Sequence, residues 1–218
     1  MRFIRLKTVN WKYIVGEILL IFVGINLAIW FNDWNSSKTI QKDKEIALTK
    51  IKEEVENNLQ QLLESREQNQ RIPLFYSELD SLKSEEGELV LSPEVMKGFV
   101  EKYEHFFTAI DSTPTGDGKY IYEGYTFINL DITDLSSISW DISKSTGIFH
   151  EFGFDCLYRM QGMYNTQELV ENELRKATEA LSNKSIDDLV RVLTFMHQLE
   201  EQLEEQYKEM INNIDNCK

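Results

Sequence analysis

The most prominent hydrophobic pattern in the chain is a nearly continuous apolar run at residues 13–34, YIVGEILLIFVGINLAIWFNDW. Because a helix rises about 1.5 Å per residue, about 20 apolar residues cross the hydrocarbon core of a bilayer. The run therefore predicts one transmembrane helix. It is longer than the apolar core of a signal peptide and ends in bulky residues, which disfavours a cleaved leader.

Two polar side chains interrupt the run. Glu17 lies about one turn inside its N-terminal edge, and Asn26 lies past its middle. A charged group at membrane depth costs roughly 3 kcal/mol on insertion scales. We therefore expect Glu17 to be protonated, paired or turned toward a partner helix. Gly24 and Ala28 have the small-x-x-x-small spacing that lets two helix backbones approach closely.

Five positions of the run share one helical face. Glu17, Ile21, Gly24, Ala28 and Phe31 recur at steps of three and four residues. Such a face favours contact with another helix, whereas a plain anchor with Glu17 in the head-group zone is the alternative. The candidate intramembrane contact comprises Glu17, Gly24, Asn26 and Ala28.

Aromatic and basic residues flank the run. The predicted interfacial anchors are Trp11, Tyr13, Trp30 and Trp34. Residues 1–12 contain four basic residues and no acid. Because positive charge favours the cytoplasmic side, the sequence predicts residues 1–12 inside, residues 13–34 in the membrane, and residues 35–218 as an extracytoplasmic domain.

The pattern after residue 38 is mostly helical, with apolar residues at steps of three and four. The expected helices cover residues 39–72, 74–82, 93–110, 133–146, 150–181 and 186–214. The first of these packs against its own domain or pairs with a neighbouring copy, and Lys44 and Glu54 are expected on its solvated face. The predicted fold class is all-α: one N-terminal transmembrane helix and a bundle of about five helices.

One segment, residues 119–130, has strand character because it is rich in Tyr, Phe and Ile. It predicts either one short β-hairpin, turning at Glu123 and Gly124, or an extended aromatic loop over the helices. Its aromatic residues form a candidate partner or ligand surface, with ordinary packing as the alternative. They are Tyr120, Tyr122, Tyr125 and Phe127.

The two cysteines, Cys156 and Cys217, lie near the free ends of the last two predicted helices. The short connection at residues 182–185 predicts that these helices are antiparallel neighbours, with Cys156 opposite a point around residue 212. A disulfide is therefore a candidate in an oxidising compartment. A frayed C-terminal tail would instead leave both thiols unpaired, and we favour that outcome from sequence.

Composition and motifs exclude several functions. The formal net charge is −14 although the first 12 residues are basic, so the remainder is strongly acidic. Such a surface disfavours nucleic-acid binding. The chain contains no zinc-protease, phosphate-loop, CxxC, nucleophile-elbow or dinucleotide motif. We therefore expect no enzyme activity, no metal and no cofactor.

The membrane segment resembles an uncharacterised bacterial family of single-span membrane proteins. The matching residues are Gly16-Glu17-Ile18, Gly24-Ile25, Ala28 and the exit Asn32-Asp33-Trp34-Asn35. The resemblance implies one anchor, a helical extracytoplasmic domain and a bacterial inner-membrane location with that domain in the periplasm. It implies no activity.

The sequence as a whole favours a membrane-anchored oligomerising subunit or scaffold of a bacterial envelope complex, acting through protein–protein contacts. Its expected partners are membrane lipid and either a second copy or another membrane protein. An extracytoplasmic sensor or ligand-binding module, built around the aromatic segment, is the first alternative. A pore-forming membrane effector is the second.

Overall fold

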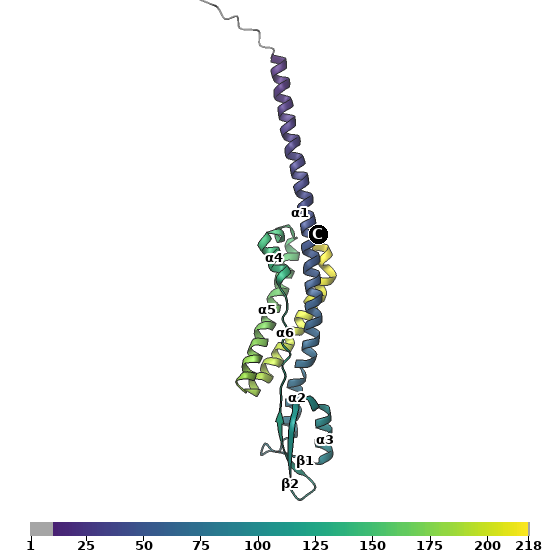
Figure 1. Ribbon diagram of the computed structural model, residues 1–218, viewed down its shortest axis with the longest axis vertical. Helices are drawn as coiled ribbons and strands as arrows, with labels where there is room; N and C mark the ends of the chain where they lie inside the picture. Colours follow the sequence, from purple (N-terminus) through teal and green to yellow (C-terminus); the bar gives the residue numbers. More distant parts are fainter. Residues whose placement is uncertain (1–10, 218) are drawn as a thin grey trace, which may run out of the picture.

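The computed structural model describes residues 11–217 and is organised along one helix, α1 (Trp11–Asn69). The first part of α1 stands free of the rest of the chain, and all side chains from residue 15 to residue 43 are exposed (Figure 1). From Lys44 onward one side of α1 is buried against the remaining elements. The helix is continuous between these parts, as expected from the lack of a Gly/Pro linker.

The remaining elements follow α1 in chain order. They are α2 (Arg71–Leu82), β1 (Leu89–Leu91), α3 (Pro93–Lys102), β2 (Phe107–Pro114), β3 (Tyr120–Thr126), α4 (Ile138–Thr146), α5 (Phe154–Ser182) and α6 (Ile186–Asn213). The strands form one antiparallel sheet in the order β1-β3-β2. This sheet, α2 and α3 lie at the end of the molecule far from the free part of α1 (Figure 1). The helical architecture predicted from sequence is confirmed.

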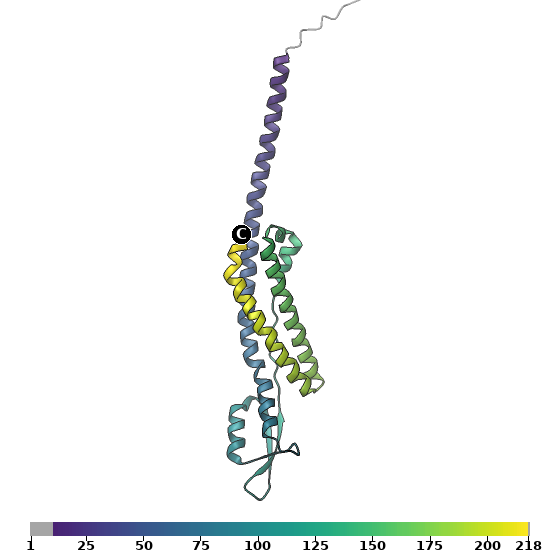
Figure 2. The same cartoon turned by 180° about the vertical axis from the view of Figure 1, so that it is seen from behind.

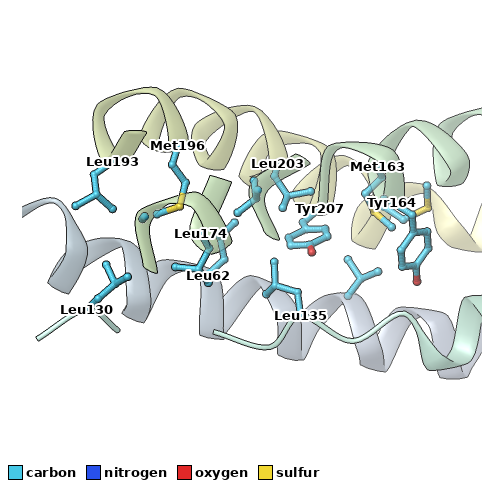
Figure 3. Packing of buried hydrophobic residues seen from close by; sticks show 14 of the residues in the cluster. Leu62, Leu130, Leu135, Met163, Tyr164, Leu174, Leu193, Met196, Leu203 and Tyr207 are labelled. Carbon is cyan, nitrogen blue, oxygen red and sulfur yellow. The ribbon is translucent and has the colours of Figure 1, made fainter. Parts of the chain in front are cut away.

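The core lies between α1, α5 and α6, with α6 packed against both of the other helices (Figure 2). Residues recurring at three and four positions on α1, such as Ile51, Val55 and Leu62, are fully buried there. Figure 3 shows Leu62 of α1, Leu135 of the extended segment before α4, and Tyr207 of α6 pointing into this interior. Burying each such aliphatic side chain contributes roughly 2 kcal/mol of transfer free energy.

An extended segment, residues 127–137, returns from the sheet to α4 along α1; we call it the strap. Two asparagines of α1 hold it. Asn69 donates from Nδ2 to the Asp131 carbonyl at 2.8 Å and accepts from its N–H at 2.9 Å. Asn58 does the same with Ser136, at 2.7 and 2.9 Å. Each side-chain amide thus supplies the two backbone hydrogen bonds that a neighbouring strand would otherwise give to one strap residue.

The strap and α1 match in length. The two asparagines are 11 residues apart on a helix, which is about 16 Å, and their partners are 5 residues apart in an extended chain, which is also about 16 Å. Glu54, one turn before Asn58, accepts from the Ser136 hydroxyl at 2.9 Å and from the Ser139 N–H at 2.7 Å. Its carboxylate therefore caps the start of α4.

Cys156 and Cys217 form a disulfide with a Cα–Cα distance of 5.5 Å. The C-terminal residues 214–217 form a 3-10 turn in which Ile214 and Cys217 are buried, rather than a frayed tail. The expectation of unpaired thiols was wrong, because this turn holds the chain end against α5. The antiparallel α5–α6 hairpin that placed the cysteines at the same end is confirmed.

The predicted helix at residues 93–110 was wrong in its second half. It ends at Lys102, and Phe107 begins β2, which pairs along its length with β3. Phe106 stacks on Phe75 of α2 with ring centroids 4.8 Å apart, and Phe107 meets the same ring edge-on at 5.6 Å. A short run of apolar and β-branched residues fits the period of a helix or that of a strand. Here the pairing of β2 with β3 favours the strand.

Three other local predictions need correction. The helix expected at residues 133–146 begins at Ile138, because Asn58 occupies both backbone groups of Ser136 and keeps that residue extended. The helical spacing of this segment also predicts Ile138 and Ile142 on its buried side, but both are exposed. Glu123 and Gly124 lie inside β3, so the hairpin turn falls between β2 and β3 instead.

Candidate functional site

Within residues 11–217, one helix is long and apolar enough to cross a membrane, and it is the N-terminal part of α1. Its most apolar window has a mean hydropathy of 2.3, and none of that window is buried by the rest of the chain. Leu20 is 74% exposed and Phe22 is 67% exposed. Large apolar side chains without any covering protein need another apolar surface, either lipid or a second protein.

The four candidate contact residues all lie on this uncovered segment. Gly24 has open space around the position that a Cβ would occupy, so the backbone is accessible to a second helix. Asn26 donates to the Phe22 carbonyl at 2.7 Å, so one amide hydrogen is already satisfied within α1. Glu17 and Ala28 are exposed, on the same side as Gly24 by helical spacing.

The predicted interfacial anchors lie at both ends of the segment. Trp11 and Tyr13 are exposed at its start. At the other end Trp30 and Trp34 stack with centroids 6.4 Å apart, and the Lys38 Nζ lies 3.9 Å above the Trp34 ring. Aromatic rings with a neighbouring cation suit the head-group zone, because one part of the cluster is apolar and the other is charged.

The aromatic residues of the strand region do not converge on one closed pocket. Tyr120 and Tyr122 are half-buried neighbours on β3 with centroids 6.1 Å apart, whereas Tyr125 is 64% exposed. Phe127 lines an open hollow of about 750 Å³ together with Arg71 and residues of α3 and the strap. The hollow is open to solvent, unlike the closed apolar cavity that the sensor hypothesis needs.

Several polar residues of the core were missed by sequence analysis. Lys44 and Glu54 are buried, at 8% and 7% exposure, although their positions predicted a solvated face. Glu54 is satisfied by the Tyr164 hydroxyl at 2.7 Å as well as by the start of α4. Burial raises the pKa of Tyr164, so its hydroxyl keeps its proton and donates it to Glu54. This network positions α4 and the strap rather than a reacting group.

A second buried acid, Glu200 on α6, is 3% exposed. Burial raises its pKa from 4.5 to about 7, against a smaller lowering by Arg66 of α1. Arg66 itself forms an ion pair with Glu204, at 2.5 Å. His197 Nδ1 lies 3.9 Å from the Glu200 carboxylate. Glu200 is therefore a group whose charge changes near neutral pH inside the domain.

This raised pKa predicts a pH-dependent stability. A folded-state pKa of about 7 exceeds the unfolded value of 4.5, so the stabilising contribution of Glu200 is complete below about pH 4.5 and is lost as pH rises to about 7. We expect Glu200→Gln to raise the free energy of unfolding by up to about 3 kcal/mol at pH 8 and to have little effect at pH 4.5. Urea unfolding followed by circular dichroism at several pH values measures this difference.

The matched control is Glu201→Gln, one residue along α6 with a side chain 63% exposed. Its effect should stay within about 0.5 kcal/mol at every pH. A Glu200→Gln difference that does not change between pH 5 and pH 8 would contradict the prediction.

No group of three or more potential metal-binding side chains occurs within residues 11–217. No family model, curated protein or solved structure matches the chain. The resemblance of the membrane segment to a bacterial single-span family therefore stays a prediction. The uncovered apolar face of α1 is the feature that the described residues offer for interaction.

Proposed function

We propose that the chain is a single-pass membrane protein that associates through α1 within the bilayer and acts as an oligomerising subunit or scaffold of a bacterial envelope complex. The observation that carries the proposal is the uncovered apolar segment with Glu17, Gly24 and Ala28 on one face. An anchor alone would need neither a carboxyl group nor a line of small residues.

The physical reason for association lies in the choice of residues. Lipid tails are as apolar as leucine, so helices associate in a bilayer through close packing and interhelical hydrogen bonds. Gly24 and Ala28 allow close backbone approach. Glu17 is costly when it faces hydrocarbon, and it is stabilised when its carboxyl group hydrogen-bonds to a polar group on a second helix.

The proposed orientation places residues 1–12 in the cytoplasm and the folded domain in the periplasm. Four basic residues before the span support a cytoplasmic N-terminus. The Cys156–Cys217 disulfide supports an oxidising compartment for the domain, because disulfides rarely persist in the cytosol.

The proposal predicts that Gly24→Leu and Glu17→Gln each reduce the oligomer. Leucine at position 24 separates the backbones, and glutamine at position 17 removes the carboxyl group while keeping the size of the side chain. We expect a fall in native mass toward the monomer, measured by light scattering with correction for the detergent. A loss of about 1–2 kcal/mol per contact would shift the equilibrium by about fivefold to thirtyfold.

Gly16→Leu is the matched control, since Gly16 is in the same helix about a quarter-turn away from the line through Gly24. It should leave the native mass unchanged. Equal masses for the parent chain, Gly24→Leu and Glu17→Gln would overturn the proposal.

A further inference from the structure

The direction of the intramembrane face relative to the folded domain can be derived, because α1 continues without interruption from Trp11 to Asn69. At 3.6 residues per turn, 18 residues make about five complete turns. Asn35, Lys42 and Ile46 each follow a residue of the intramembrane face by 18 positions, namely Glu17, Gly24 and Ala28 in turn. The intramembrane face therefore continues along these three residues outside the apolar run.

The folded domain lies on the opposite side of the helix. Ile51, which is fully buried against the domain, follows Gly24 by 27 residues, or about seven and a half turns. Lys44 and Leu48 are buried on the same side. The domain thus leaves Asn35 and Lys42 exposed, whereas Ile46, although half exposed, borders a hollow with Ile142 of α4.

The spacing on the intramembrane face indicates how a second helix would cross it. Glu17, Ile21, Gly24, Ala28 and Phe31 are separated by four, three, four and three residues. This alternation is the repeat of left-handed helix pairs, whose axes cross at only about 20°. Helices with this repeat coil around each other, so the contact continues beyond Phe31 through Asn35, Lys38 and Lys42, which keep the same alternation.

We propose that the partner of α1 is a second copy of this chain, packed parallel to it, with the seam continuing through Asn35 to Lys42 and the two folded domains on opposite outer sides. This inference rests on the proposed function and specifies its partner. In the repeat of this face Asn35 takes an a position, where an asparagine pairs with the same asparagine of a parallel, in-register second copy. Lys42 lies on the seam, so the bilayer segment supplies most of the affinity.

Single cysteines in the exit segment test the arrangement in the full-length chain in native membranes. The natural cysteines are bonded to each other, so an added cysteine supplies the free thiol. Asn35→Cys and Lys42→Cys lie on the proposed seam and should form disulfide-linked dimers on mild oxidation. Ser37→Cys and Ile40→Cys are matched controls, because they are exposed in the same stretch but lie about half a turn away.

The geometry separates the two pairs clearly. Helices packed 8–10 Å apart bring seam Cα atoms within the roughly 7 Å that a disulfide requires. Cα atoms on the outer sides of the pair are then more than about 12 Å apart. We expect most of the chain to be dimeric for the seam variants, and the outer variants to stay at the level of the parent chain.

The outcomes distinguish this inference from the proposed function. Cross-linking at Asn35 and Lys42 that disappears when Gly24→Leu is added supports both. An oligomer sensitive to Gly24→Leu, but with equal cross-linking at all four positions, with preference for Ser37 and Ile40, or with no cross-linking, would overturn the parallel seam and leave the proposed function standing. A chain that is monomeric by light scattering and also forms no cross-linked dimer would overturn both the proposed function and this inference.

Discussion

Replacing Asn58 by alanine is expected to lower the free energy of unfolding by about 3 kcal/mol, because it removes the hydrogen bonds to Ser136 and leaves a small cavity. Asn58 is completely buried and holds both the N–H and the carbonyl of Ser136. It also donates to Gln167 at 3.3 Å. Alanine would remove the partner of the Ser136 N–H, while the Ser136 carbonyl keeps a longer bond from Gln167 Nε2 at 3.4 Å and Gln167 Oε1 keeps the Tyr207 hydroxyl. Urea unfolding of the detergent-solubilised chain measures the change.

Asn57 provides the control, because it is the same residue type on the same helix and is exposed. Asn57→Ala should change the free energy of unfolding by no more than about 0.5 kcal/mol. Equal effects at the two positions would show that Asn58 does not hold the strap.

Removing the disulfide is expected to have an effect at least as large. The bridge closes a loop with a sequence separation of 61 residues, and the chain-entropy model gives about 4 kcal/mol for such a loop. The double variant Cys156→Ser, Cys217→Ser should therefore unfold about 10 °C lower than the parent chain, as followed by circular dichroism.

Adding a reductant to the parent chain serves as the control for this experiment. It should lower the midpoint to that of the double variant and leave the double variant unchanged. A double variant that unfolds at the temperature of the oxidised parent would contradict the stabilising role of the bridge.

The helical part of the fold could be predicted from sequence because its signals are local. Apolar residues at steps of three and four placed α6 within one residue of its end, and Ser92 before Pro93 marked the start of α3. The Ser92 hydroxyl accepts from the Val95 N–H, as an N-cap should. Gly147 ends α4 in a left-handed conformation, also as the sequence predicts.

The strap and the sheet could not be predicted, because the partners that define them are distant in sequence. Asn58 and Ser136 are separated by 78 positions, and Asn69 and Asp131 by 62. A buried asparagine in an apolar stripe is the available signal, since a polar side chain there needs a partner. It does not identify that partner, and the short runs around Ile110 and Ile138 fit more than one structure.

The candidate interaction face illustrates the same distinction. Its residues and their helical alignment follow from sequence, since hydropathy and spacing are properties of one segment. Its direction relative to the domain does not, because that requires knowing that α1 is unbroken from the apolar run into the core and that Ile51 is buried there. The inference of two outward-facing domains depends on this continuity.

The matched lengths of α1 and the strap restrict how such a chain can gain or lose residues. One residue inserted between Asn58 and Asn69 would turn Asn69 by about 100° and move it about 1.5 Å along the helix, away from Asp131. One residue inserted in the strap would move its backbone by about 3.3 Å and reverse its faces. Insertions and deletions are therefore tolerated here as paired events, about 11 residues in the helix with about 5 in the strap, which preserve both the turn count and the reach.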